Sequence, residues 1–504
     1  EAGMKQMRVS RITTTLLFLI CWTANHCHAA DSPNIILLMG DDHGWDETGY
    51  NGHPHLKTPV LDEMATSGLR LDRFYSAHPS CSPTRGSVIT GRHPNRYGTF
   101  NPGYSLRPDE ISIATLLRKA GYHCGHFGKW HLGPVKRHSP TNPGAFGFHQ
   151  WLSHDNFFEL NPVLSKNGRT PTVISGEGSQ IIIDSAIEFI RTANRKGKPY
   201  FLVIWFGSPH EPYSGLPADL RLYDDVVETY ADKSFRLTSN ETGEPTTRPL
   251  GEILRERYAE ITAMDRSIGE LRSWLDKENL RENTILWYCG DNGTPGDGII
   301  TSPYRGKKGT MYDGGIRVPA VIEWPKEFDK HGVISANTVT SDILPTLCRI
   351  AGTPLPERSL DGIDLLPILS GEQKGRKSPI GFWSYSSSQV DRDTPYIKPE
   401  LQIGTTPLVK KMKGIYTRNF TNFIHPKITA SNFLGPRVWL NDEYKLVIHE
   451  QDKRRQVELF NIHEDPVESK NIVSENPEIV ERMMAELELW QTSVLTSLIG
   501  GDYE

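Results

Sequence analysis

Residues 34–42 read Asn-Ile-Ile-Leu-Leu-Met-Gly-Asp-Asp, an unbroken apolar run that ends in two carboxylates. A run without polar alternation is typical of a strand buried on both faces, as in a parallel sheet. Two further runs of this kind follow far along the chain, at residues 200–206 and 284–289. Because helical patterns separate them, the sequence predicts an α/β fold with a large, mostly parallel sheet flanked by helices.

Helical periodicity marks the segments between and after these strands. The predicted helices cover residues 58–65, 113–120, 181–193, 254–275 and 342–351. Residues 134–176 are rich in Pro, Gly, Asn and His, and we expect loops there. The regular pattern loosens near residue 375, and two strand patterns and a final helix follow, at residues 445–449, 457–462 and 479–495. We therefore expect a large α/β domain over residues 31–375 and a smaller C-terminal α+β subdomain over residues 376–504.

The composition of the 504-residue chain is that of a globular protein. Hydrophobic residues make up 37%, charged residues 23%, and the formal net charge is −5, which gives no electrostatic reason to expect nucleic-acid binding. The mean hydropathy is −0.46, and no apolar run is long enough for a transmembrane segment. The six cysteines show neither the spacing of a disulfide framework nor that of a zinc site.

The N-terminal segment has the pattern of a secretory signal peptide. Residues 5–11 are basic, residues 16–22 are apolar, and Ala29-Ala30 offers a cleavage site. We interpret residues 1–30, from Met4, as this signal, and we expect a secreted or periplasmic protein. A short buried helix is the alternative, and the polar residues that follow directly argue against it.

The stretch Cys-Ser-Pro-Thr-Arg that begins at Cys81 has the pattern of a helix start. Ser82 is a favourable N-cap, Pro83 fits the first helical position, and Gly91 can end the helix. Cys81 would then precede the positive end of the helix, with Arg85 about one turn inside. An anion could bind there through free N–H groups and the guanidinium. A buried cysteine before an ordinary helix fits these residues equally well.

Polar side chains follow the ends of the predicted strands. The first strand ends at Asp41 and Asp42, the second leads to His210, the third to Asp291 and Asn292, and a fourth, shorter strand to Lys129 and His131. In open α/β sheets ligands bind beyond the carboxyl ends of the strands, so these side chains should gather at one edge. The carboxylate and amide oxygens suit Ca²⁺ or Mg²⁺ better than zinc. Each pair taken alone could also be an ordinary turn.

Taken together, these motifs resemble the type I sulfatases of the alkaline-phosphatase-like superfamily, over about residues 31–500. The matching segments are Asn-Ile-Ile-Leu-Leu-x-x-Asp-Asp at 34–42, Cys-x-Pro-x-Arg at 81–85, Gly-Lys-Trp-His-Leu-Gly at 128–133, Arg-Gly-x-Lys at 305–308 and the closing segment 458–468. One departure is Asp46-Glu47, where many members have Gly-Asp, and we expect it to touch no ligand.

The resemblance implies a set of site residues. It implies that a formylglycine-generating or sulfatase-maturating enzyme converts Cys81 to Cα-formylglycine (3-oxoalanine), whose hydrate is the nucleophile. It implies one Ca²⁺ ion, with the ligands Asp41, Asp42, Cys81, Asp291 and Asn292. The implied catalytic residues are Cys81, Arg85, Lys129, His131, His210 and Lys308. Among these, Lys129 and Lys308 would bind the sulfate, His131 would assist its elimination, and His210 would protonate the leaving group.

The implied activity is hydrolysis of sulfate monoesters, on a sulfated carbohydrate or an aryl sulfate. A phosphonate or phosphodiester hydrolase of the same superfamily is the nearest alternative, since some of these share Cys-x-Pro-x-Arg. The Gly-Lys-Trp-His-Leu-Gly and Arg-Gly-x-Lys matches favour sulfate. An inactive sulfated-glycan-binding protein should lack a nucleophile, metal or Lys/His position, and none is missing.

Overall fold

The structure is a computed structural model. It describes residues 32–240, 242–328, 331–386, 395–402, 407–412, 415–417, 421, 425, 427–451 and 454–503. The predicted signal peptide lies outside the described residues. Within these described ranges, no helix combines the length and apolar character needed to cross a membrane.

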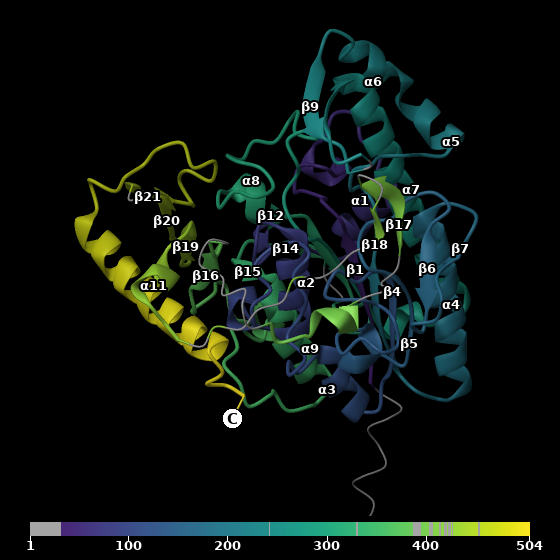
Figure 1. The fold of residues 1–504 in the computed structure, drawn as a ribbon, viewed down its shortest axis with the longest axis horizontal. Coiled ribbons are helices and arrows are strands. Elements are labelled where there is room, and N and C mark those ends of the chain that lie inside the picture. Colours follow the sequence, from purple (N-terminus) through teal and green to yellow (C-terminus); the bar gives the residue numbers. More distant parts are fainter. Residues whose placement is uncertain are drawn as a thin grey trace, which may run out of the picture.

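A ten-stranded sheet forms the centre of the molecule (Figure 1), in the order β14-β2-β13-β11-β1-β8-β4-β5-β6-β7. Its middle five strands pair in parallel: β11 (Thr284–Gly290), β1 (Asn34–Gly40), β8 (Tyr200–Trp205), β4 (His123–Lys129) and β5 (Gln150–His154). The flanking strands are mostly antiparallel: β13 (Ala320–Glu323), β2 (Leu69–Leu71), β14 (Gly332–Ile334), β6 (Val163–Lys166) and β7 (Thr172–Val173). The predicted fold class is confirmed.

The register of the central strands aligns their carboxyl ends. Gly40 of β1 pairs with Gly290 of β11, Met39 with Trp205 of β8, and Trp205 in turn with Gly128 of β4. The residues that directly follow these strands therefore meet at one edge of the sheet, as the sequence predicted.

Helices cover both faces of the sheet (Figure 1). Ile35, Leu37 and Met39 face one layer, which contains α2 (Cys81–Thr90), α3 (Ile113–Lys119) and α9 (Ile343–Ile350). Ile36 and Leu38 face the other, which contains α1 (Pro59–Ser67), α4 (Gly178–Arg195) and α7 (Leu250–Lys277). This alternation follows from the two-residue period of a strand, and burial on both faces explains the unbroken apolar run.

The structure also contains shorter elements. The helices are α5 (Pro217–Leu220), α6 (Asp224–Thr229), α8 (Asp313–Ile316) and α10 (Leu366–Leu369). A small sheet contains β12 (Arg317–Val318), β3 (Phe74–Tyr75) and β15 (Thr338–Val339), and two hairpins pair β9 (Ser234–Thr238) with β10 (Pro245–Pro249) and β17 (Pro407–Met412) with β18 (Ile415–Thr417).

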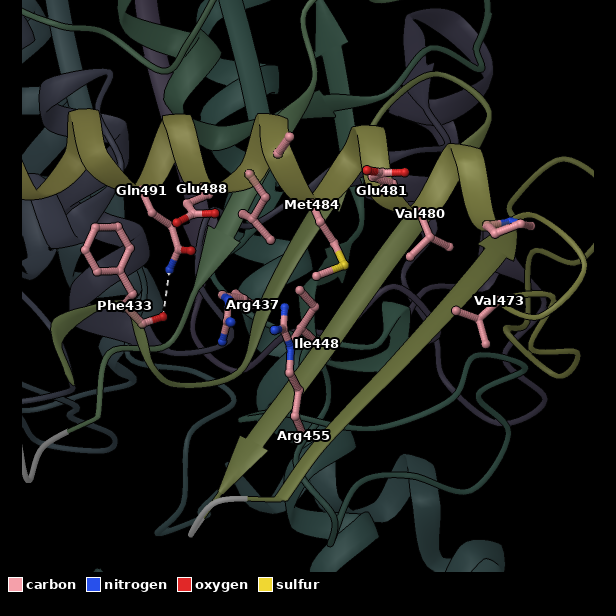
Figure 2. A pocket seen from close by; sticks show the side chains of 13 residues that line it. Phe433, Arg437, Ile448, Arg455, Val473, Val480, Glu481, Met484, Glu488 and Gln491 are labelled. Atoms are coloured by element: carbon pink, nitrogen blue, oxygen red, sulfur yellow. Dashed lines mark hydrogen bonds between the residues drawn. The ribbon is translucent and has the colours of Figure 1, made fainter. Parts of the chain in front are cut away.

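A four-stranded sheet and a long helix lie towards the C-terminus. The strands are β16 (Ile380–Trp383), β19 (Arg437–Leu440), β20 (Tyr444–Gln451) and β21 (Arg454–Asn461), and the helix is α11 (Pro477–Leu498). In Figure 1 α11 runs along the outer side of this sheet. A groove of about 590 Å³ lies between them, and Figure 2 shows Val480, Met484 and Ile448 lining it. A domain boundary near residue 376 stays a prediction.

Two expectations about local structure were wrong. Residues 134–176 do not form only loops, because they contain β5, β6 and β7, and β5 extends the central sheet. These strands are short and carry polar residues, so they lack the unbroken apolar signal. Helix α2 begins at Cys81, with Ser80 as its N-cap, rather than at Pro83. Ser82 does not cap it, since its hydroxyl accepts the N–H of Gly103 at 3.2 Å.

Candidate active site

The end of β1 forms the base of the site. The backbone N–H of Asp41 donates to the carbonyl of Ser208, at 2.9 Å, beyond β8. The N–H of Asp42 donates to Oδ1 of Asp291, at 2.9 Å, beyond β11. Asp42 has a φ of 60°, a left-handed conformation that a residue with a Cβ rarely adopts. These bonds join three strand ends and turn Asp42 back towards the centre of the site.

Cys81, the first residue of α2, lies against Asp42. Its Sγ is 3.7 Å from Oδ1 of that carboxylate, and only 1% of the side chain's surface is exposed. Val88 and Ile89 anchor α2 in the core on the sheet, and Gly91 ends it with a φ of 70°, as predicted. Burial raises the pKa of the Cys81 thiol, so the unmodified side chain is neutral and a poor nucleophile.

Three cations face three carboxylates around Cys81. Nζ of Lys129 lies 2.5 Å from Oδ2 of Asp41, and Nζ of Lys308 lies 2.6 Å from Oδ2 of Asp42. Arg85 donates to Oδ2 of Asp291 at 2.7 Å and lies 3.4 Å from Oδ1 of Asp41. The formal charges of these six groups cancel. A hard cation bound here would leave an excess of positive charge, which suits an anionic ester.

The pKa values of Asp42 and Asp291 are shifted in opposite directions. Burial favours the neutral form of Asp42, but Lys308, His210 and Lys129 outweigh it and hold the pKa of that carboxyl well below its usual value. Burial and the neighbouring Asp41 raise the pKa of Asp291 to about 6, against the pull of Arg85. Asp42 therefore stays ionised.

The residues present fit a hard divalent cation. Among the residues that the structure describes, Oδ1 of Asp41 and Oδ1 of Asn292 are buried and have no hydrogen-bond partner. The amide nitrogen of Asn292 lies 3.0 Å from Oδ1 of Asp42. Buried oxygens of this kind are the atoms a calcium or magnesium ion would coordinate. A group of potential ligand atoms within 4.8 Å of one another comes from Asp41, Asp42, Cys81 and His210.

The two predicted histidines occupy different places. Nδ1 of His210 donates to the carbonyl of Glu211 at 2.5 Å, and Nε2 lies 3.6 Å from Oδ2 of Asp42. Phe157 stacks on this ring, with 4.8 Å between centroids, and burial lowers the pKa of His210 to about 3. His131 is buried and follows β4 two residues beyond Lys129, at the same sheet edge, with a φ of 54°.

The site opens on one side. The side chains of Arg85, Lys129, Asp41 and Asp291 are fully buried, whereas Lys308 is 24% exposed and His210 11% exposed. A substrate would therefore enter past Lys308 and His210. Direct contacts join the following predicted site residues into one cluster: Asp41, Asp42, Cys81, Arg85, Lys129, His210, Asp291, Asn292 and Lys308.

Sequence reasoning missed Arg257, Glu47 and Trp205. Arg257 on α7 forms a buried ion pair with Glu47 and donates to the carbonyl of Asp42 at 2.6 Å. In the described part of the chain, Glu47 itself contacts no predicted metal ligand, but its partner Arg257 contacts Asp42. A signal was present, because Arg257 interrupts the apolar stripe of the predicted helix. Trp205, at the end of β8, lies under Arg85 with 5.1 Å from guanidinium carbon to ring centroid, and the sequence shows it only as a core residue.

The fold is α/β, and at one edge of its parallel strands it brings together a buried cysteine, three carboxylates and three cations. The chain belongs to the sulfatase family, whose pattern it matches over residues 33–353. It is 31% identical to N-acetylgalactosamine-6-sulfatase of Mus musculus over 402 residues, covering 70% of this chain and 69% of that protein. It is also 31% identical to arylsulfatase A of Homo sapiens, over 72% of each chain. The predicted family and its sulfatase class of enzyme are confirmed.

Solved structures share the fold at lower identity. The structure of Ps i-CgsB matches with a TM-score of 0.72 and 22% identity, over 92% of this chain and 93% of that one. A structure solved with its substrate D-glucosamine-2-N,6-O-disulfate matches with a TM-score of 0.69 and 20% identity, over 92% and 98%. The phosphonate monoester hydrolase of Agrobacterium radiobacter matches with a TM-score of 0.60 and 19% identity, over 92% and 97%. At these identities the likeness concerns the fold alone.

Proposed function

We propose that this protein hydrolyses sulfate monoesters on sulfated carbohydrates, with a formylglycine formed from Cys81 and one bound Ca²⁺ ion. The observation that carries the proposal is the position of Cys81, whose sulfur lies 3.7 Å from Asp42 inside a ring of three carboxylates and three cations. A phosphate ester has a similar shape, but family membership favours sulfate.

Two groups absent from the structure would complete the site. The formylglycine hydrate would supply a hydroxyl nucleophile whose second hydroxyl allows sulfate to leave again. A Ca²⁺ ion would supply Lewis-acid stabilisation of the sulfuryl oxygens, and we propose that Asp41, Asp42, Asp291, Asn292 and the modified residue at position 81 hold it.

The chain's own residues would then have distinct tasks. Lys129 and Lys308 would hold the sulfuryl oxygens, because both ammonium groups point at the carboxylates beside Cys81. Arg85, fixed between Asp291 and the ring of Trp205, would orient the side chain at position 81.

Proton transfers would involve three further residues. Asp291 would accept the proton of the attacking hydroxyl, and His131 would assist the release of sulfate. His210 would protonate the leaving oxygen, a role worth roughly 10²–10⁴ in rate. Burial lowers the pKa of His210 to about 3, and the negative charge of a bound sulfate ester would raise it and so favour the protonated ring. The place of His210 at the open side of the site supports this role, since the leaving alcohol must lie towards solvent.

The substrate class rests on the relatives. N-acetylgalactosamine-6-sulfatase and the neighbour solved with a glucosamine disulfate both carry sulfated sugars in their descriptions, whereas arylsulfatase A keeps an aryl sulfate open. We further propose a secreted or periplasmic location and maturation of Cys81 by a formylglycine-generating or sulfatase-maturating enzyme.

The test compares p-nitrophenyl sulfate with bis-p-nitrophenyl phosphate and p-nitrophenyl phenylphosphonate, with the protein produced together with a maturating enzyme. We expect the sulfate ester to have the highest kcat/KM. A higher value for a phosphonate or phosphate diester would replace this proposal by the phosphonate/phosphodiester hydrolase alternative. Release of sulfate from defined sulfated sugars would then identify the substrate.

A further inference from the structure

Arg257 is a fully buried cation in the N-terminal part of α7. It lies on the apolar side of the helix, between Leu254 and Ile261, which are also fully buried. Burying a guanidinium is costly unless its charge and donors are satisfied. Its presence in the core therefore requires specific partners.

Glu47 neutralises this charge with two short contacts. Nε of Arg257 donates to Oε1 of Glu47 at 2.6 Å, and Nη2 donates to Oε2 at 2.6 Å. The carboxylate of Glu47 also accepts from the hydroxyl of Thr294 at 3.4 Å, two residues beyond Asn292. The Arg257–Glu47 pair therefore contacts the loops that follow β1 and β11.

Two further donors of Arg257 reach backbone carbonyls at the site, and Nη1 also donates to the hydroxyl of Tyr213 at 3.2 Å. Nη2 donates to the carbonyl of Asp42 at 2.6 Å, and Nη1 donates to the carbonyl of Pro209 at 2.6 Å. Pro209 directly precedes His210, and Asp42 has the left-handed φ of 60°. One rigid, planar group therefore bridges the loop of the proposed metal ligand and the loop of the proposed general acid.

We propose that Arg257, held by Glu47, is a positioning residue that fixes Asp42 relative to His210. The inference rests on the proposed function, because it assigns the bridge to a metal ligand and a leaving-group acid. A lysine cannot reproduce it, since a single ammonium cannot reach the carboxylate and both carbonyls in the geometry of the guanidinium fork.

The experiment compares Arg257→Lys with Arg272→Lys. Arg272 is a matched control, because it lies on the same helix, is 5% exposed and forms a double contact with Glu323 at 2.8 and 3.1 Å. Both variants lose a buried Arg–Glu fork, but Arg272 contacts no residue of the site in the described part of the chain. Three readouts are measured: Ca²⁺ affinity by calorimetry, kcat/KM, and amide hydrogen exchange.

We expect Arg257→Lys to weaken Ca²⁺ binding by about tenfold or more. It should also lower kcat/KM for a sugar sulfate more than for p-nitrophenyl sulfate, because the nitrophenolate leaves without much protonation. Amides in residues 41–47 and 207–213 should exchange faster. Arg272→Lys should lower thermal stability and leave all three readouts at the wild-type values.

The inference would be overturned if Arg257→Lys kept the wild-type Ca²⁺ affinity, the wild-type ratio of kcat/KM between the two esters and wild-type hydrogen exchange in both loops. A lower unfolding temperature of this variant would not change that conclusion. Should that variant fail to fold, Glu47→Gln serves instead, since it keeps the side-chain size and removes the charge that holds Arg257. Assays of the wild-type protein test the proposed function separately. If the wild type shows no sulfatase turnover, the proposed function fails, while hydrogen exchange in the two loops still tests whether Arg257 bridges them.

Discussion

At position 81 the chain places a small thiol where three carboxylates and three cations meet. A neutral, buried thiol is a weak nucleophile, and a sulfated thiol would have no easy route for releasing sulfate. The surroundings of Cys81 are therefore better suited to a modified side chain than to the cysteine itself.

Cys81→Ala should abolish turnover, while Cys81→Ser should accumulate a sulfated enzyme, because a single hydroxyl can attack but cannot expel the sulfate. Intact-mass spectrometry of Cys81→Ser after incubation with substrate checks this, and full steady-state activity of that variant would refute it.

Lys308 and its neighbour Lys307 offer a second test at the residue scale. Nζ of Lys308 contacts both oxygens of Asp42, whereas Lys307 is exposed. Lys308→Ala should lower kcat/KM by about 10²–10³, the cost of losing one electrostatic contact to the transition state. Lys307→Ala should stay within about twofold, because surface substitutions away from special features have small effects. Equal losses in the two variants, measured with one sulfate ester, would argue against a sulfate-binding role for Lys308.

At the scale of elements, the loop that carries Lys308 is tied to the C-terminal sheet. Lys445 of β20 is fully buried, and its Nζ lies 2.6 Å from Asp313 at the start of α8 and 2.6 Å from Glu468. Oε2 of Glu468 also accepts the backbone N–H of Asp313 at 2.7 Å. The C-terminal sheet therefore fixes the segment that follows the lysine loop.

Removing this buried cation should destabilise the protein. Lys445→Met should lower the free energy of unfolding by about 3–5 kcal/mol, since two buried carboxylates lose their partner, and it should reduce kcat/KM through displacement of the Lys308 loop. Lys470→Met is the control, because Lys470 pairs with Glu475 on the surface, where the side chains are 69% and 57% exposed and ion pairs contribute little. Urea unfolding monitored by tryptophan fluorescence compares the two, and a similar small loss in both would contradict this link.

Elements with a strong apolar signal could be predicted from the sequence, and weaker ones could not. The strands β1, β8 and β11 and the helix α7 stand out because each is buried along a whole face or more. The strand β5 did not, since its run Gln-Trp-Leu-Ser-His mixes polar and apolar residues, and it pairs with β4 on one side and β6 on the other. The start of α2 was misplaced by two residues because Ser82 and Pro83 both suit a helix start, whereas Ser80 is the N-cap residue in the structure.

At the scale of the whole molecule, the strand order brings distant residues together. Asp41, Cys81, Lys129, His210 and Asp291 meet because β11, β1, β8 and β4 are neighbours in parallel register. The sequence could predict that these residues share an edge, but not their distances, since the order of strands is a tertiary property. Arg257 was missed for the same reason, because its role depends on contacts between α7 and the loops that follow β1 and β8.

Removal of the metal should abolish activity and lower the stability of the protein without unfolding it. The six charges of the site cancel without an ion, so a chelator should abolish activity while the protein remains folded. Ca²⁺ at about 100 times its Kd should stabilise the protein by about 2.7 kcal/mol relative to the metal-free form. Calorimetric unfolding with chelator, Ca²⁺ or Mg²⁺ measures this, and full activity in the chelator would exclude a metal-dependent mechanism.

The most direct measurement relates turnover to the chemical state of residue 81. Preparations made with different amounts of maturating enzyme are assayed on one sulfate ester, and the fraction of aldehyde at position 81 is determined by peptide mass spectrometry. We predict that kcat per enzyme molecule rises in proportion to this fraction and extrapolates to zero when every molecule carries the thiol. Turnover that is independent of the aldehyde fraction would contradict the central claim.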